Sequence, residues 1–219
     1  MNQRVMLCSR LMLDIIGVIP MENTKDRKDT DVCVDVKGGA VNVRRHRSVK
    51  RIGLIALGVA VAGLAAWSRW PMPLLPPGAK ADLVVVRKAA HRLDLYQGGA
   101  LLKSYAVSLG RHPIGPKQQQ GDGKTPEGQY ILDYRKPDSS FYRALHVSYP
   151  AAQDLTAARA RGVDPGGLVM VHGMKNGLGW LGRLHLALDW TDGCVALTNR
   201  EMDEVWRAVP DGTRIILEP

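Results

Sequence analysis

Cys194 is the residue best placed for chemistry, because it directly follows Gly193 in the polar segment DWTDGCVALTN, residues 189–199. A cysteine attacks well only as the thiolate, so it needs a nearby base, and histidine is the common choice. Glycine lets a substrate or another backbone approach closely. The amides of Gly193 and Cys194 are therefore candidate donors to an oxyanion, provided that they point at the attacked carbonyl.

His172 is favoured as the base, since it ends an apolar run and is followed by Gly173 and by a glycine-rich stretch that leads to Cys194. His185 is an alternative base, although a role in substrate contact or in the structure suits it better. Cysteine and histidine at such a separation also occur in inert proteins, and a buried free cysteine is often only a small apolar residue. The spacing alone therefore leaves catalysis open.

The elements that would position these residues are mostly strands. Glycine-rich residues 110–128 predict a long loop, which in a compact domain is usually functional. Helices are expected at 151–161, before Gly162, and at 199–209 with Asn199 as N-cap. Runs rich in β-branched or alternating apolar residues predict strands at 81–88, 92–96, 101–109, 129–134, 144–149, 168–171 and 213–217. These elements predict a mainly β domain with two small helices.

An uncharged apolar run, IGLIALGVAVAGLAAW at 52–67, directly follows a cluster of arginines and lysines. Its length suits a short membrane-spanning helix, and basic residues tend to stay in the cytoplasm. We therefore expect one pass through the cytoplasmic membrane and a periplasmic domain, with a cleaved signal as the alternative. The expected parts are a disordered basic cytoplasmic segment at 1–50, a transmembrane signal anchor at 51–70, a proline-rich linker at 71–81 and the domain at 82–219.

The net charge of +9 does not indicate a nucleic-acid partner. Residues 1–70 hold 12 of the 30 lysines and arginines but only 6 of the 21 acidic residues, so much of the basic excess lies outside the predicted domain. Three cysteines are too few for a disulfide framework, and Cys194 is the one cysteine of the predicted exported part. No histidine or cysteine spacing favours a metal, so the spacing does not predict a metal site.

Three segments, in this order, resemble the L,D-transpeptidase catalytic domain of the YkuD or ErfK type. They are GDGKTPEGQY at 121–130, the His-Gly pair at 172–173 and Thr-Asp-Gly-Cys at 191–194. The resemblance covers about residues 82–218. It implies a compact β-sandwich-like domain with a helix packed at one side, here preceded by the single transmembrane helix.

The resemblance also implies a mechanism. Cys194 would form a thioester, His172 would be the base, and the carbonyl of Gly173 would hold the imidazole. The substrates of the family are peptidoglycan stem peptides: the enzyme attacks the bond after diaminopimelate, expels D-Ala and passes the acyl group to an amine of a second stem. No metal or organic cofactor takes part.

Five further positions are candidate contacts to the stem peptides. Asp192 stands where many family members have a histidine, and it could bind a cationic amine of the acceptor or simply be solvated. Arg183 could pair with a substrate carboxylate, and Trp180 could cover the stem or pack in the core. Thr191 and His185 complete the set.

Three functions remain open from the sequence. An amine acceptor gives an L,D-transpeptidase. Water as the acceptor gives an L,D-carboxypeptidase or amide hydrolase, since the motif Trp-Thr-x-Gly-Cys-x-Ala at 190–196 is similar to a branch that includes carboxypeptidases. The third is an inactive wall-binding module on a membrane anchor. The sequence does not indicate the oligomeric state.

Overall fold

The computed structural model describes residues 32–37, 40–45, 48–68 and 73–219. The chain divides into two units, Met1–Ala65 and Ala66–Pro219, and each is described by itself. Much of the segment predicted to be disordered, 1–50, lies outside the described residues. Within it, strands β1 (Val32–Lys37) and β2 (Ala40–Arg45) pair as an antiparallel hairpin.

Helix α1 (Ser48–Ser68) covers the uncharged apolar run. In the part of the chain that the structure describes, no helix meets the length and apolarity needed to cross a membrane. The transmembrane anchor at 51–70 and the periplasmic location therefore stay predictions.

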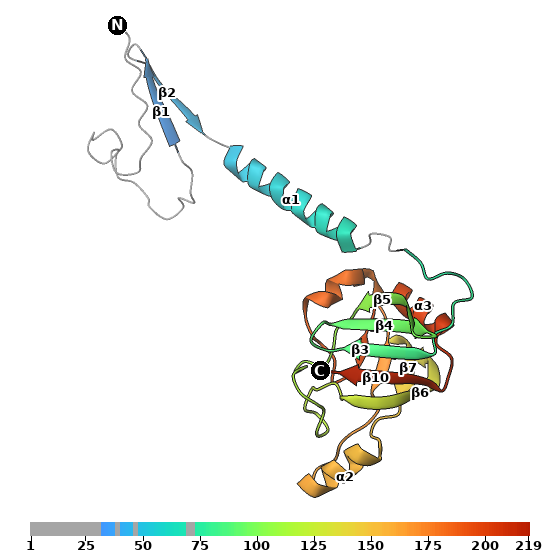
Figure 1. The fold of residues 1–219 in the computed structure, drawn as a ribbon. Helices are drawn as coiled ribbons and strands as arrows, with labels where there is room; N and C mark the ends of the chain where they lie inside the picture. Colours follow the sequence, from blue (N-terminus) through green and yellow to red (C-terminus); the bar gives the residue numbers. More distant parts are fainter. Residues whose placement is uncertain (1–31, 38–39, 46–47, 69–72) are drawn as a thin grey trace. The chain divides into compact units, whose positions relative to one another are not determined.

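The second unit is built on a sheet of eight strands. Figure 1 labels β3 to β7 and β10 of this sheet. Along the sheet the order is β5-β4-β3-β10-β6-β7-β8-β9. The β3–β10 and β8–β9 pairs are parallel, and the others are antiparallel. The strands are β3 (Leu83–Arg87), β4 (Arg92–Gln97), β5 (Ala100–Ala106), β6 (Gly128–Ser139), β7 (Tyr142–Val147), β8 (Met170–His172), β9 (Val195–Ala196) and β10 (Thr213–Glu218).

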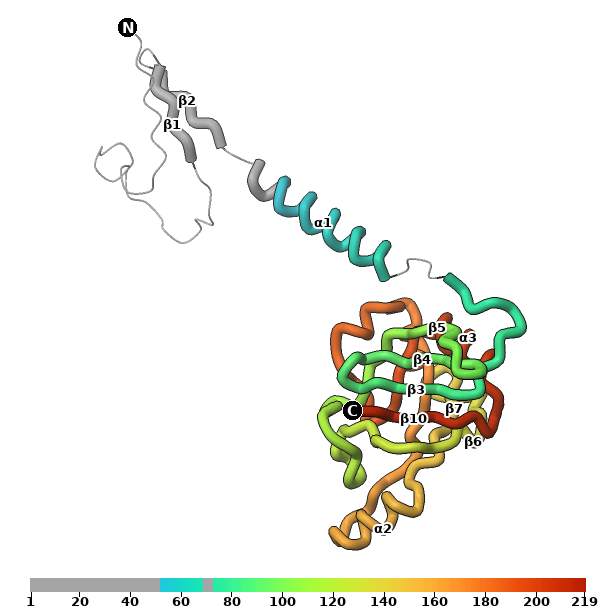
Figure 2. Tube along the Cα trace, in the orientation of Figure 1, coloured from blue at the N-terminus to red at the C-terminus, as the bar shows by residue number. Residues whose placement is uncertain are grey.

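The sheet curls so that its two ends meet. Ser108, just past β5 at one end, forms an antiparallel bridge with Ala196 of β9 at the other end, and Gly110 forms a parallel bridge with Thr191. The prediction of a mainly β domain is thereby confirmed. The layers expected of a sandwich-like domain are formed by one curled sheet, and the tube in Figure 2 traces its strands. Buried apolar side chains form the core on the inner face of the curled sheet, among them Val84, Leu95 and Ile215.

Two helices flank this sheet. Helix α2 (Ala152–Arg161) ends at Gly162, whose left-handed φ of 68° makes it the expected glycine C-cap. Helix α3 (Asn199–Ala208) turns Met202 and Val205 into the core. A 3-10 segment at Gly179–Ala187, absent from the sequence prediction, lies between β8 and β9.

The N-cap of α3 is Thr198, so the prediction of Asn199 was wrong. Thr198 and Glu201 form a reciprocal capping box, in which the Thr198 hydroxyl accepts from the Glu201 amide and the Glu201 carboxylate accepts from the Thr198 amide. The Asn199 side chain is used elsewhere: its Oδ1 accepts from the amide of Met174, 2.8 Å away. Asn199 therefore ties α3 to the segment that follows β8.

The packed domain includes residues upstream of 82. Leu75, inside the predicted 71–81 linker, is only 7% exposed, and its amide donates to Glu204 Oε2 at 3.0 Å. Lys103 Nζ and the Tyr105 hydroxyl donate to the same carboxylate oxygen. The last part of the proline-rich stretch is thus held on the core by a buried carboxylate of α3.

Candidate active site

Strands β8 and β9 bring His172 and Cys194 to the same face of the sheet. In the parallel register Val171 faces Val195 and His172 faces Ala196, and Cys194 directly precedes β9. Side chains alternate along a strand, so fully buried Val171 and Val195 occupy one face while His172 and Cys194 share the other. The two side chains are offset by two residues on neighbouring strands, and both line one cavity.

His172 is fixed in one tautomer. Its Nδ1 lies 2.6 Å from the carbonyl oxygen of Gly173, and since a carbonyl only accepts, Nδ1 carries the proton. Nε2 is therefore the free base nitrogen. Phe141 packs against the imidazole with ring centroids 4.7 Å apart, and Trp190 lies edge-on at 5.8 Å.

Residue 173 must be a glycine in this arrangement. A Cβ at this position would lie 2.9 Å from Asn199 Oδ1 and 3.0 Å from the Cβ of Tyr142. The Gly173 amide also donates to the carbonyl of Arg143 on β7. The predicted role of Gly173 in holding the imidazole thus agrees with its contacts.

The imidazole of His172 is only 4% exposed. Burial lowers the pKa of His172 to about 4, and the bond to Gly173 offsets only part of that effect. The side chain is therefore neutral at pH 7 and able to accept a proton at Nε2.

The thiol of Cys194 is also protonated at rest. Burial raises its pKa above the ordinary value, and the nearby charge of Asp192 acts in the same direction. The Met170 amide, which donates to Sγ at 3.4 Å, and the charge of Lys117 lower it in part. The resting pair is thus a thiol and a neutral imidazole, which suits proton transfer during attack rather than a preformed thiolate.

Thr191 holds the turn before the thiol. Its Oγ1 accepts from the Gly193 amide at 3.1 Å and donates to the Cys194 carbonyl at 2.8 Å. The Gly193 amide must exchange this partner before it can serve an oxyanion, and the Cys194 amide stays a predicted oxyanion donor. Gly193 has a φ of +128°, and a Cβ there would lie 2.4 Å from the Lys124 carbonyl oxygen, so only glycine fits without strain.

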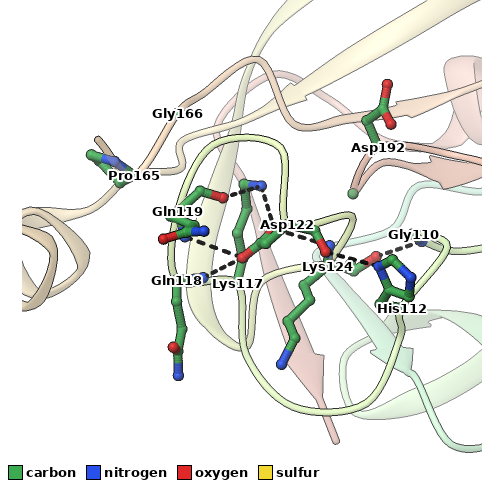
Figure 3. A network of polar contacts seen from close by, with 12 residues as sticks. Gly110, His112, Lys117, Gln118, Gln119, Asp122, Lys124, Pro165, Gly166 and Asp192 are labelled. Atoms are coloured by element: carbon green, nitrogen blue, oxygen red, sulfur yellow. Dashed lines mark hydrogen bonds and ion pairs between the residues drawn. The ribbon is translucent and has the colours of Figure 1, made fainter. Parts of the chain in front are cut away.

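The loop between β5 and β6, residues 107–127, packs against this turn through the carbonyl of Lys124 beside Gly193. A long loop was predicted here, and its functional role stays a prediction. Its centre is the carboxylate of Asp122, which Figure 3 shows surrounded by donors. Oδ1 accepts from Lys117 Nζ at 2.9 Å and from the Lys124 amide at 3.0 Å. Oδ2 accepts from the amides of Gln118 and Gln119 at 2.7 and 3.1 Å.

Burial alone would raise the pKa of Asp122, but these four donors outweigh it and lower the pKa to about 2. Lys117 is buried beside the turn: its Nζ is 3.9 Å from the place a Cβ would take on Gly193. The Asp122 carboxylate thus holds one side of the loop and places a buried cation next to the residue before the thiol.

A second buried lysine holds the other side of the loop. Lys88 follows β3 and is 2% exposed. Its Nζ donates to the carbonyls of Gly115 and Thr125 and pairs with Glu127 at 2.7 Å. Three acceptors satisfy its three protons, so the buried charge is compensated.

The cavity at this site has a volume of about 650 Å³, within the range of peptide and small-molecule sites. Besides His172, Thr191 and Cys194, it is lined by three rings and by charged side chains. The rings belong to Tyr134, Phe141 and Trp190, and the charges to Arg135, Lys136, Asp138, Lys175 and Asp192.

The predicted contact residues divide into two groups. Thr191 and Asp192 line the cavity, and Asp192 is paired with Arg111. Arg183, His185 and Trp180 belong to the 3-10 segment and do not line it. The Trp180 side chain is exposed.

His185 is buried beside the cavity without lining it, and it is bonded to Ser108. The distance from Nδ1 to Ser108 Oγ is 3.0 Å, and the same hydroxyl donates to the His185 carbonyl. Burial lowers the pKa of His185 to about 4, assisted by the proximity of His172. Its contacts fit a structural role beside the site.

Several cavity residues escaped the sequence analysis. Phe141 lies in the β6–β7 turn and Lys175 just beyond β8, where no periodic pattern marks them. Lys117, which lies beside Gly193 but does not line the cavity, was also missed: it is a basic residue within the long loop, and nothing in the sequence shows that it is buried. Among the described residues, no group of histidine, cysteine and acidic side chains is arranged to hold a metal ion.

Comparison with known proteins identifies the class. Residues 81–217 match the family YkuD, the L,D-transpeptidase catalytic domain. The chain belongs to this family.

A curated relative is YafK of Escherichia coli (strain K12), which is named provisionally as an L,D-transpeptidase. It is 34% identical over 132 residues, which are 58% of this chain and 46% of YafK. This chain thus matches about half of the length of its relative.

The fold is also similar to a solved structure, that of the helical cell shape determining protein Pgp2 from Campylobacter jejuni. The TM-score is 0.50 with 22% identity, over 72% of this chain and 54% of Pgp2. This likeness concerns the fold alone.

Proposed function

We propose that this protein is a peptidoglycan L,D-transpeptidase that acts through a thioester on Cys194. The observation that carries the proposal is the placement of His172 and Cys194 on the same face of the neighbouring strands β8 and β9, where both line the cavity of about 650 Å³. Membership of the YkuD family supports the same reaction class.

In the first half-reaction, Nε2 of His172 takes the thiol proton while Sγ of Cys194 attacks the carbonyl carbon of a stem-peptide amide. The resulting oxyanion would be held by the Cys194 amide. The C–N bond then breaks, the leaving amine takes the proton from His172, and the acyl group remains on sulfur as a thioester.

In the second half-reaction, an amine of another stem attacks the thioester carbonyl and gives a proton to His172. The C–S bond breaks, the acyl group passes to the amine, and Sγ regains the proton from the imidazole. The neutral histidine and neutral thiol at rest support this sequence, because the proton returns to its starting atom.

Water as the acceptor is the second candidate, giving an L,D-carboxypeptidase. One observation favours it: Asp192, the predicted partner of an acceptor amine, is already paired with Arg111. An amine must compete with that arginine, whereas water needs no such partner.

We also propose that the uncharged run at 52–67 forms part of an anchor in the cytoplasmic membrane, with the domain in the periplasm, although the described part of α1 does not by itself meet the length and apolarity needed to cross a membrane. The uncharged run at 52–67 and the basic residues before it support this topology. Peptidoglycan substrates would then be reached by a domain on the outer side of that membrane. Protease accessibility in intact spheroplasts tests the proposal: the domain should be cleaved from outside, and its protection would contradict it.

The reaction is tested by incubating the full chain with a disaccharide tetrapeptide and separating the products by mass spectrometry. A cross-linked dimer supports transpeptidation, and tripeptide alone supports the carboxypeptidase. Cys194→Ala should abolish either product. Absence of turnover by the wild-type protein would leave the inactive wall-binding module as the better reading.

A further inference from the structure

The charged residues of the cavity are not equivalent, because some already have partners. Arg135 pairs with Asp211 and donates to two backbone carbonyls of the α3 end, those of Trp206 and Val209. Asp192 pairs with Arg111.

Three charged groups of the lining remain. Lys136, Lys175 and Asp138 make no side-chain hydrogen bond or ion pair with any other described residue. The free charge of the cavity is thus two ammonium groups and one carboxylate.

Lys136 lies in the same cross-strand row as His172. In the sheet register Lys136 faces Ala144, Ala144 faces His172, and His172 faces Ala196. Paired residues point to the same face, so Lys136 and His172 share a face with a small alanine between them. Strands are about 4.8 Å apart, which places the two Cα atoms roughly 10 Å apart. A lysine side chain at that distance can reach a ligand bound at the histidine.

Lys175 approaches the same cavity from a rigid loop. The Met174 amide is bonded to Asn199 Oδ1, and the Asn176 amide to the Ser140 carbonyl at 2.9 Å. The Asn176 side chain bridges the β6–β7 turn as well, accepting from the Tyr142 amide and donating to the Ser139 carbonyl. The backbone on both sides of Lys175 is therefore fixed, while its ammonium group is unpaired.

We propose that Lys136 and Lys175 form a carboxylate-binding subsite that positions the acyl donor at Cys194. The inference rests on the proposed function and adds the chemistry of donor recognition to it. Two unpaired ammonium groups lining one cavity suit an anionic group, and a carboxylate is the anion that a peptide carries. Donors with a free carboxylate near the attacked carbonyl are preferred over donors with an amide at that place.

The test uses the full chain, a donor peptide with free carboxylates and the same peptide with those carboxylates amidated. Lys136→Gln and Lys175→Gln should each raise KM for the free-acid donor by about tenfold, the size of one partly exposed charge-assisted contact, with kcat changed less than about threefold. The amidated donor should show the raised KM already with the wild-type protein, and the two variants should not change it further.

Two controls separate a specific subsite from general charge. Lys80→Gln removes a lysine that donates to the Arg207 carbonyl and does not line the cavity, and it should leave KM unchanged. Asp138→Asn removes the remaining carboxylate of the lining, and it should lower KM for the free-acid donor or leave it unchanged. If the two cavity variants keep the wild-type KM, these lysines are merely solvated and the inference is wrong.

A second readout keeps this test distinct from the proposed reaction. Protection of Cys194 from alkylation by the donor peptide, measured on the peptide that contains Cys194, reports binding without turnover. If the wild-type protein is inactive, the proposed function fails, but protection that is lost in the two cavity variants still supports the subsite. Protection independent of the lysines, or none with the wild-type protein, overturns it.

Discussion

The pKa shifts of Cys194 and His172 both favour the uncharged form of the side chain. Burial raises the pKa of the thiol and lowers that of the imidazole to about 4. An ion pair formed beforehand would need the opposite shifts. The charge therefore develops only during attack, and the groups that meet the oxyanion matter more than thiolate content at rest.

This state predicts two pH limits. The rate at which iodoacetamide alkylates Cys194 should keep rising with pH to values above the pKa of an ordinary thiol. It should show no plateau between about pH 5 and 8. Turnover should persist to about pH 5 and fall as His172 takes up a proton near pH 4, because an imidazolium cannot accept the thiol proton. Pseudo-first-order alkylation rates and kcat/KM profiles measure both limits. A plateau of reactivity at neutral pH would indicate a thiolate–imidazolium pair instead.

Gly193 is a second point where one residue decides the site. Gly193→Ala places a Cβ against the Lys124 carbonyl oxygen at a φ of +128°, and it should cost about 2–4 kcal/mol of unfolding free energy together with activity. Gly212→Ala is the matched control, because Gly212 also has a positive φ, +86°, but nothing within 4 Å of the added atom. Urea denaturation should show a clearly larger loss for Gly193→Ala; equal losses would mean that the contact with Lys124 is unimportant.

At the scale of elements, the site depends on a loop held by buried charges. Asp122 gathers four donors on one side of loop 107–127, and Lys88 satisfies three acceptors on the other. A loop without regular structure would otherwise be mobile. These contacts keep its backbone against Gly193.

Asp122→Asn should lower the unfolding free energy by about 1–3 kcal/mol at pH 7, because the Lys117 charge loses its partner. The wild-type pKa of about 2 lies below that of an unfolded aspartate, so the stabilisation is present above about pH 4 and lost as pH falls towards 2. Urea titrations at pH 7 and pH 3 measure the change. Asp192→Asn, at an exposed pair, should cost less than about 0.5 kcal/mol. A pH-independent difference between wild type and Asp122→Asn would contradict this account.

The sequence predicted some elements well and others poorly, for physical reasons. The long loop and the Gly162 cap follow from local residue types and are confirmed. The assignment of Cys194 as nucleophile and His172 as base stays a prediction. The N-cap at Thr198 was misassigned by one residue because two neighbouring capping residues compete, and Asn199 is used in a tertiary contact. Arg183, His185 and Trp180 were expected at the site, but they lie in a 3-10 segment whose direction depends on packing that no sequence period reveals.

At the scale of the whole domain, the folded part begins earlier in the chain than residue 82, where the sequence predicted its start. Linker residue Leu75 is 7% exposed and bonded to buried Glu204, whereas its neighbour Leu74 is 59% exposed. Proline-rich composition predicted an extended spacer here, and composition does not show which of its side chains meets the core. The part of the predicted linker that contains Leu75 therefore belongs to the folded domain.

The two leucines form a matched pair for testing this boundary. Leu75→Ala should lower the unfolding free energy by about 2–4 kcal/mol through the lost burial, while Leu74→Ala should change it by less than about 0.5 kcal/mol. Thermal and urea denaturation of the full chain measure the difference. Equal effects of the two substitutions would place the start of the domain nearer to residue 82.

The most direct test of the account is the mass of the protein while it turns over a donor. Rapid acid quenching of the full chain with a disaccharide tetrapeptide, followed by proteolysis and mass spectrometry, should find the acyl group on the peptide that contains Cys194. The adduct should be absent from Cys194→Ala and should form orders of magnitude more slowly in His172→Ala. Product formed by Cys194→Ala, or an acyl group on another residue, would contradict the central claim.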